Sequence, residues 1–225
     1  MYLDKSLEEK LKKFARTIAE ANRRFNLTGF KTEDEIYNKL VIGSLLPFRN
    51  LHILTETTFI DIGSGAGIPG IPFGIYFQKM KGLLLESNSK KADFIRRVID
   101  DLCIINLKVL CGRAEDIIRE TGFRESLDWV FARAFHDIYS AIEFGAPYLR
   151  ISGLMYIYSD RSSLELPTEV IQHAERLGIR FIVRDEFVEY GIEKGLLLCK
   201  YDHTPDTYPR RFPVVKREAR RLMWQ

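Results

Sequence analysis

The sequence predicts an α/β fold: a doubly wound, mostly parallel sheet with an antiparallel C-terminal hairpin and an N-terminal helical extension. From residue 58, short apolar runs alternate with helical patterns, which is typical of a parallel sheet with helices on both faces. The last two apolar runs, 179–190 and 195–202, are too close for a helical crossover, so we expect them to pair antiparallel. Before residue 50 the patterns are helical.

Two helices are expected in the extension. Ser6 and Glu9 have the spacing of a capping box, and apolar residues then recur at helical spacing as far as Ile18. The second helix is expected over 33–46, ending before Pro47. Lysines and arginines cover the other faces of the first helix, and they fit either a solvated surface or a surface that faces RNA.

The remaining elements follow in order. Strands are expected at 58–62, 82–86, 107–111, 128–133 and 153–159, before the closing hairpin, whose turn is expected at Gly191–Lys194. Helices are expected at 68–77, 90–102, 114–121, 137–149 and 167–178. We therefore expect residues 1–50 to form the extension, 51–204 the cofactor-binding domain and 205–225 a basic C-terminal tail.

Composition narrows the function classes. The chain has 225 residues, 46% of them hydrophobic, which suffices for one sizeable core. No apolar run approaches the roughly 20 residues that span a bilayer, and the N-terminus lacks the apolar core of a signal peptide. Three cysteines without a CxxC pair and four scattered histidines predict reduced thiols and no metal site. We expect a cytoplasmic monomer without a membrane partner.

A glycine-rich loop follows the first expected strand. Gly63, Gly65 and Gly67 lie where doubly wound sheets bind ligands, and glycine lets the backbone approach a ligand closely. Glu86 ends the next strand, 21 residues after Gly65, where a carboxylate can bind a ribose diol. Both a dinucleotide and S-adenosylmethionine (SAM) can use this layout.

Three details favour SAM as the cofactor. Asp61, two residues before the first glycine, would repel a pyrophosphate but attract the ammonium of a methionyl group. The glycine spacing is GxGxG rather than the GxGxxG of dinucleotide sites. Pro69 and Pro72 also stiffen the start of the following helix.

Two more loops are candidates for the same site. In a SAM site the loop 112–116, after the third strand, faces the adenine, although its acidic residues also suit a helix N-terminus. Arg133 ends the fourth strand, where an arginine is costly to bury without a partner, so we expect it to contact a ligand or the substrate.

These motifs together resemble the bacterial small-subunit rRNA guanine-N7 methyltransferase family, RsmG or GidB. The matching segments are 22–30, 59–72, 84–94, 112–116, 132–135 and 208–211, in the family's order. The resemblance implies a class I SAM-dependent methyltransferase with a Rossmann-like sheet. It implies methyl transfer from SAM to N7 of guanine 527 in the 530 loop of 16S rRNA, within the small ribosomal subunit.

The resemblance also implies roles for individual residues. Gly63 and Ile68 would line the methionine end of SAM, and Glu86 would bind the ribose. Ala114 and Glu115 would meet the adenine, and Arg133 would complete the pocket. Two departures stand out: the family's His-x-x-Asp-Ser is here Leu40–Ser44, and its Lys-Gly after the fifth strand is here Ser159-Asp160.

Two basic regions are candidates for RNA binding. Arg24, Asn26 and Thr28 are expected at an RNA-facing rim, although Asn26–Thr28 also suit a helix end and turn. The C-terminal segment is an RNA-binding arm or a solvated tail, and its cations are Arg210, Arg211, Lys216, Arg217, Arg220 and Arg221.

No general base is expected, because N7 of guanine carries a lone pair and needs only to be held in line with the methyl group. The guanine itself must be unstacked from its neighbours. Two alternatives remain open at this point: a SAM-binding RNA-interaction protein without catalysis, and a nicotinamide-dependent oxidoreductase on the same sheet.

Overall fold

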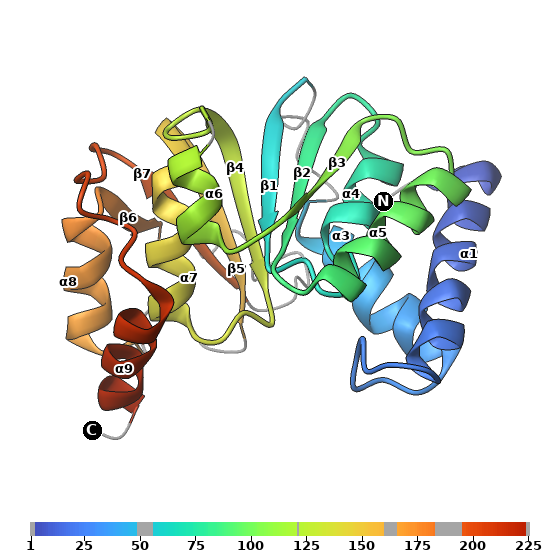
Figure 1. Ribbon diagram of the computed structural model, residues 1–225. Coiled ribbons are helices and arrows are strands. Elements are labelled where there is room, and N and C mark those ends of the chain that lie inside the picture. Colours follow the sequence, from blue (N-terminus) through green and yellow to red (C-terminus); the bar gives the residue numbers. More distant parts are fainter. Residues whose placement is uncertain (1–2, 49–55, 121, 160–165, 183–194, 224–225) are drawn as a thin grey trace.

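The computed structural model describes residues 3–48, 56–120, 122–159, 166–182 and 195–223. They form one seven-stranded sheet in the order β3-β2-β1-β4-β5-β7-β6 (Figure 1). The pairs among β1 to β5 are parallel, and β7 runs antiparallel to both β5 and β6. The predicted fold class, with its antiparallel C-terminal hairpin, is confirmed.

The expected strands are all present within the described residues. Their bounds are β1 Thr58–Ile62, β2 Lys81–Glu86, β3 Leu107–Cys111, β4 Leu127–Arg133, β5 Leu149–Tyr158, β6 Ile179–Ile182 and β7 Gly195–Lys200. β5 begins four residues earlier than predicted, because its first residue already pairs with Leu127 of β4. The expected turn and residues 183–190 of the first hairpin strand lie outside the described residues.

The helices also follow the predicted order. Their bounds are α1 Lys5–Asn22, α4 Gly70–Tyr76, α5 Ser89–Asp101, α6 Ala114–Glu120, α7 Ile138–Gly145, α8 Thr168–Arg176 and α9 Phe212–Met223. The predicted helix over 33–46 is a run of short helical pieces, namely α2 Glu33–Glu35, a π-helical stretch Ile36–Ile42, α3 Gly43–Leu45 and a 3₁₀ turn Leu46–Phe48. Another 3₁₀ turn, Ala146–Tyr148, follows α7.

The start of α1 differs from the prediction. Asp4, not Ser6, caps the helix, and its side chain accepts a hydrogen bond from the N–H of Leu7 (2.8 Å). The capping box expected here occurs instead at α2, where Thr32 and Glu35 exchange the two hydrogen bonds. Ser6–Glu9 and Thr32–Glu35 both have the Ser/Thr-x-x-Glu spacing of a capping box, so the spacing alone does not show which pair forms one.

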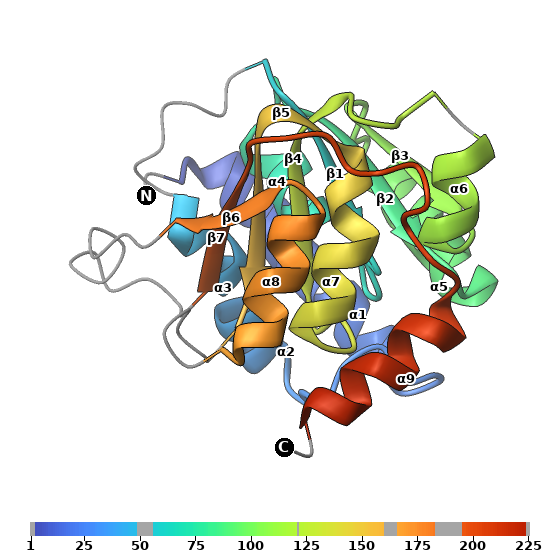
Figure 2. The ribbon, with the colours of Figure 1, turned by 90° about the vertical axis from the view of Figure 1, so that its left-hand side faces the viewer.

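The core has two halves, one on each face of the sheet. Helices α1, α3, α4 and α5 cover one face and α6, α7, α8 and α9 lie on the other (Figures 1 and 2). Leu11 and Phe14 of α1 belong to the same buried cluster as Phe59 of β1. The N-terminal extension therefore packs directly onto the sheet domain.

Helix α9 was not predicted. It lies along the α7 side of the sheet, where Val215 and Ala219 are buried in the second core cluster (Figure 2). The charged residues of this segment therefore stand on an ordered helix, which fixes their position relative to the rest of the molecule.

Within the part of the chain that the structure describes, no helix is long and apolar enough to cross a bilayer. In the same residues, no group of three or more histidine, cysteine, aspartate or glutamate side chains could hold a metal ion.

Candidate functional site

A cavity of about 550 Å³ opens at the carboxyl ends of the parallel strands. Loops after β1, β2, β3 and β4 contribute to it, as the topology of a doubly wound sheet predicts. Both ends of the chain contribute as well. The lining residues are Leu27–Phe30, Leu40, Gly63–Ala66, Ile68, Leu85–Ser87, Lys91, Gly112–Glu115, Arg133–His136, Phe144 and Phe212.

The glycine loop bends sharply at the floor of this cavity. Gly63, Gly65 and Gly67 all have positive φ, at 71°, 57° and 87°, a conformation that glycine adopts without steric cost. A Cβ on Gly67 would lie 2.6 Å from Ile71, so packing explains that glycine, which is also absent from the lining. A Cβ on Gly65 would meet no packed side chain, only the Gly63 carbonyl at 3.8 Å. Gly65 is thus the position where the backbone is open to a ligand.

Glu86 connects the glycine loop to the loop after β2. Its carboxylate accepts hydrogen bonds from the N–H groups of Gly65 and Asn88, both at 2.8 Å. The side chain borders the cavity but the residue is only 7% exposed. A carboxylate has about four lone-pair positions, so two remain for the hydroxyl groups of a ribose. Glu86 therefore shapes the loop as well as facing the cavity.

Asp61 lies beneath the glycine loop and does not reach the cavity lining. One carboxylate oxygen accepts a hydrogen bond from Gly70 N–H (3.0 Å). The other, Oδ1, is buried with no hydrogen-bond partner among the described residues. Burial raises the pKa of Asp61 to about 7. An orphaned buried acceptor next to a ligand cavity suits a cationic ligand, and SAM carries both an ammonium and a sulfonium group.

Ala114 and Glu115 lie at the start of α6, in the loop expected to meet adenine. The Ala114 carbonyl accepts a hydrogen bond from the Tyr148 hydroxyl (2.9 Å). The Glu115 carboxylate accepts a hydrogen bond from the N–H of Phe212, at the start of α9 (3.1 Å). The loop after β3 is therefore joined to the C-terminal helix.

Arg133 lines the cavity and binds the N-terminal extension. Its guanidinium donates to the carbonyls of Lys39 (2.8 Å) and Leu40 (3.2 Å) and lies over the Tyr158 ring, 4.9 Å from its centroid. Tyr158 in turn donates its hydroxyl hydrogen to the Ser44 carbonyl (2.6 Å). Of the two family departures, Leu40 thus reaches the cavity, whereas Asp160 lies outside the described residues.

One wall of the cavity comes from the loop after α1. The Asn22 side chain accepts hydrogen bonds from Leu27 and Thr28 N–H and donates to the carbonyls of Thr28 and Phe30. Thr28 reaches the cavity, while Arg24 and Asn26 are exposed outside it. Asn22, which sequence reasoning did not single out, therefore shapes the predicted RNA rim.

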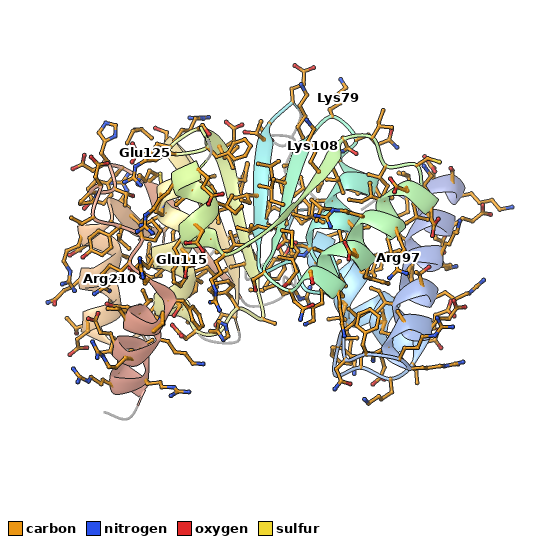
Figure 3. The ribbon with its side chains drawn as sticks, viewed as in Figure 1. Lys79, Arg97, Lys108, Glu115, Glu125 and Arg210 are labelled. Carbon is orange, nitrogen blue, oxygen red and sulfur yellow. The ribbon has the colours of Figure 1, made fainter. Side chains whose placement is uncertain are left out.

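The predicted C-terminal cations divide into two groups. Arg210 binds inward: its guanidinium contacts the Glu143 carboxylate (2.7 and 2.9 Å) and Glu218 (2.8 Å). The others carry their charge on the α9 side of the cavity, and we call them the α9 cations: Arg211, Lys216, Arg217, Arg220 and Arg221. All but Lys216 are exposed. Figure 3 shows Arg210 near the start of α9, on the same side of the sheet as Glu115.

Glu143 is the buried centre of the Arg210 cluster. It is fully inaccessible to solvent, and His173 Nε2 lies 3.2 Å from its carboxylate. Burial alone would raise the pKa of Glu143, but the contacts with His173 and Arg210 outweigh it and lower the pKa to about 2. The Arg210 guanidinium is thus held by buried and half-buried carboxylates, which leaves it poorly placed to bind phosphate.

Sequence reasoning missed the aromatic side chains around the cavity. The lining includes Phe135, His136, Phe144 and Phe212. None of them is a glycine or an acidic residue, the residue types by which the sequence indicated the ligand-binding loops. Phe135 packs over the glycine loop, since a Cβ on Gly63 would come within 2.8 Å of its ring. It follows Ala134, a non-glycine residue with φ of 51°, which turns the chain toward the cavity.

Comparison with known proteins identifies relatives over most of the chain. The family model GidB, described as rRNA small subunit methyltransferase G, matches residues 7–181. The chain is 32% identical to the ribosomal RNA small subunit methyltransferase G of Fervidobacterium nodosum over 197 residues, covering 87% of this chain and 91% of that one. It is 34% identical to the protein of that name from Moorella thermoacetica, covering 86% and 82%.

Solved structures with low sequence identity share the fold. The structure of M. jannaschii TYW2 in complex with AdoMet matches with a TM-score of 0.51 at 16% identity, covering 72% of this chain and 74% of that one. The [4+2]-cyclase SpnF matches with a TM-score of 0.52 at 11% identity, covering 69% and 62%. Because one neighbour is a cyclase, these likenesses establish the architecture and leave the chemistry to the site.

Proposed function

The chain belongs to the GidB family, rRNA small subunit methyltransferase G, and we propose that it methylates N7 of guanine 527 in the 530 loop of 16S rRNA. That it is a SAM-dependent rRNA methyltransferase follows from the family. The position and the atom are our proposal, and they rest on the resemblance of the site motifs. Family membership also removes the nicotinamide-dependent oxidoreductase alternative.

The arrangement of Glu86 and Asp61 around the glycine loop supports assigning each part of the cofactor to individual residues. We assign the ribose to Glu86 and the methionine end to Gly63, Gly65 and Ile68, with the Asp61 carboxylate beneath the loop favouring the cationic groups. We assign the adenine to the loop that contains Ala114 and Glu115. Arg133 closes the cavity from the β4 side. Gly67 supports the loop from outside the cavity.

Little acid-base chemistry is required of the protein. SAM, when bound, supplies an electrophilic methyl group on a sulfonium. N7 of guanine has a free lone pair, so no side chain needs to remove a proton before attack. The chain's own contribution is then to hold the base in line and close to the methyl group. The rigid loop, fixed by Glu86 and by hydrogen bonds from Gly63 and Ser64 to the Leu85 carbonyl, suits that task.

Two basic surfaces flank the cavity and are proposed to bind the RNA backbone. Arg24, Asn26 and Thr28 lie on the side of the N-terminal extension, and the α9 cations lie on the other side. Residues 23–32 and helix α9 both extend past the carboxyl ends of the strands, on opposite sides of the sheet (Figure 1). An RNA loop held between them would present an unstacked base to the cavity. Arg210 is left out of this proposal, because it is bound to Glu143 and Glu218.

The experiment is methyl transfer from radiolabelled SAM to small subunits, and separately to naked 16S rRNA, from a strain that lacks the modification. Reduction and aniline cleavage at N7-methylguanine then identify the nucleotide. We expect a single cleavage at guanine 527. Labelling at another nucleotide, or at an atom that does not cause cleavage, would contradict the proposed position while leaving the family assignment intact.

A non-catalytic RNA-binding protein is the remaining alternative. It would bind both SAM and RNA but transfer no label, so calorimetry with SAM on the same preparation distinguishes it from an unfolded or inactive sample. We further propose that the protein works in the cytoplasm, because its substrate is there, and that it is a monomer, because the N-terminal extension, the loops after four strands and the start of α9 of one chain all contribute to the cavity. Light scattering coupled to gel filtration tests the monomer.

A further inference from the structure

The side chain of Phe212, the first residue of α9, is part of the cavity although it lies 79 residues beyond Arg133, the last of the predicted cofactor residues. Its ring centroid is 4.8 Å from His136 and 6.0 Å from Phe144, and the Arg113 guanidinium lies 5.2 Å from it. Its N–H donates to Glu115. Phe212 therefore contacts the loops after β3 and β4 at once.

The position of these contacts indicates which part of the cofactor Phe212 meets. The strands at the cavity run in the order β3-β2-β1-β4. With the ribose at Glu86, which ends β2, and the methionine end at the loop after β1, the adenine extends toward the loop after β3. Arg113 and Glu115, both in that loop, are among the residues that contact Phe212.

The segment that leads into Phe212 is fixed by Arg210. Both its backbone N–H and its guanidinium bind Glu143, and the guanidinium also binds Glu218 and the Tyr139 hydroxyl. Glu143 is on α7, next in sequence to Phe144, which lines the cavity. Arg210 therefore ties the chain, two residues before Phe212, to the helix that supports the cavity wall.

We propose that Phe212 is the wall against which the adenine of SAM packs, and that Arg210 is a positioning residue that holds Phe212 in place. This inference rests on SAM being the cofactor. It gives the C-terminal segment a role in cofactor binding that is separate from any contact with RNA. Arg211, adjacent to Arg210, is exposed and serves as the matched control for charge.

The test is calorimetry on the full-length protein with SAM and with adenosine, which lacks the methionine end. The variants are Phe212→Leu, Arg210→Gln, the double variant and Arg211→Gln, all measured well below their melting temperatures. Loss of one aromatic contact should weaken SAM binding roughly three- to tenfold. We expect Phe212→Leu to weaken SAM and adenosine by the same factor, and Arg211→Gln to leave the affinity for SAM unchanged.

The double variant separates positioning from general stability. Because Arg210 acts through Phe212, Arg210→Gln should add little to the loss already caused by Phe212→Leu, whereas independent effects would multiply. Should Arg210→Gln fail to fold, because the buried Glu143 has lost its Arg210 partner, Phe212→Leu alone still tests the wall, since it leaves the ion pair intact.

Three results would overturn the inference. An unchanged SAM affinity in Phe212→Leu would show that Phe212 does not contact the adenine. A loss of affinity for SAM but not for adenosine would place the ring at the methionine end. Unchanged SAM affinity with slower methyl transfer at saturating SAM would assign the ring to the target base. If the parent protein bound no SAM at all, the failure would lie with the proposed cofactor instead.

Discussion

Replacing Glu86 by alanine should damage both the fold and the site, and the structure allows the two effects to be separated. The carboxylate holds the N–H groups of Gly65 and Asn88. Alanine removes both acceptors from a nearly buried position, so the glycine loop loses its connection to β2. A role limited to ribose binding would leave the stability of the ligand-free protein unchanged, and the structure argues against that.

The expected magnitudes follow from the two hydrogen bonds. A hydrogen bond to a charged group contributes about 1.5–3 kcal/mol, so the loss of two predicts a fall of roughly 3–6 kcal/mol in the free energy of unfolding. Water entering the emptied space should keep the fall near the lower value. Urea denaturation followed by circular dichroism measures it. Losing the ribose contact as well should weaken SAM binding by about 10- to 150-fold.

Asp128→Ala is the matched control. Asp128 is also a carboxylate that accepts two hydrogen bonds, from the N–H and the Oγ1 hydroxyl of Thr58 (both 2.7 Å), but it lies near the start of β4, beside the start of β1, and outside the cavity. The Asp128→Ala variant should be less stable than the parent and should bind SAM with the parent's affinity. The reasoning is refuted if Glu86→Ala binds SAM as tightly as Asp128→Ala does, or if it unfolds at the parent's urea concentration.

Four further outcomes are expected. Replacing the α9 cations by glutamine should flatten the slope of log RNA affinity against log salt by about 2, if three of them contact phosphate at about 0.7 each; an unchanged slope would place the RNA surface elsewhere. Gly65→Val should abolish SAM binding in calorimetry, at a stability cost of about 1–2 kcal/mol for its left-handed backbone; a folded variant that binds SAM normally would show that the loop only turns the chain. Burial raises the pKa of Asp61 to about 7, so the protonated form stabilises the ligand-free protein at low pH and this contribution is lost as the pH rises through 7. A cationic ligand favours the ionised form, and SAM affinity should therefore increase from about pH 5 to about pH 7, with no such increase in Asp61→Asn. Contacts with Arg210 and His173 lower the pKa of Glu143 to about 2, so its contribution to stability is present above about pH 4.5 and is lost as the pH falls toward 2; Glu143→Gln should be less stable than the parent at neutral pH and lose less stability in acid melts.

The strands and the loops that line the cavity could be predicted because their signals are local. Apolar runs of strand length, glycines at the end of β1 and an acid at the end of β2 each lie within a few residues of the feature they specify. Helix α9 had a local signal too, since Phe212, Val215 and Ala219 recur at helical spacing. The dense positive charge between them favoured the interpretation as a tail.

The roles of Arg210 and Arg211 could not be predicted. The two residues are adjacent and chemically identical, yet one is bound to a buried carboxylate and the other faces solvent. The difference arises from Glu143, 67 residues earlier in the chain. Nothing in the spacing of the sequence connects them, because the contact depends on where α7 packs against the C-terminal segment.

The convergence of both chain ends on one cavity determines how RNA binding must be tested. Deleting residues 208–225 would remove the α9 cations, but it would also remove Arg210 from Glu143 and Phe212 from the cavity wall. It would further uncover the core that Val215 and Ala219 cover. Loss of RNA binding in such a truncation could follow from any of these changes. Glutamine in place of the exposed arginines changes charge alone, so only those variants can assign the RNA surface to α9.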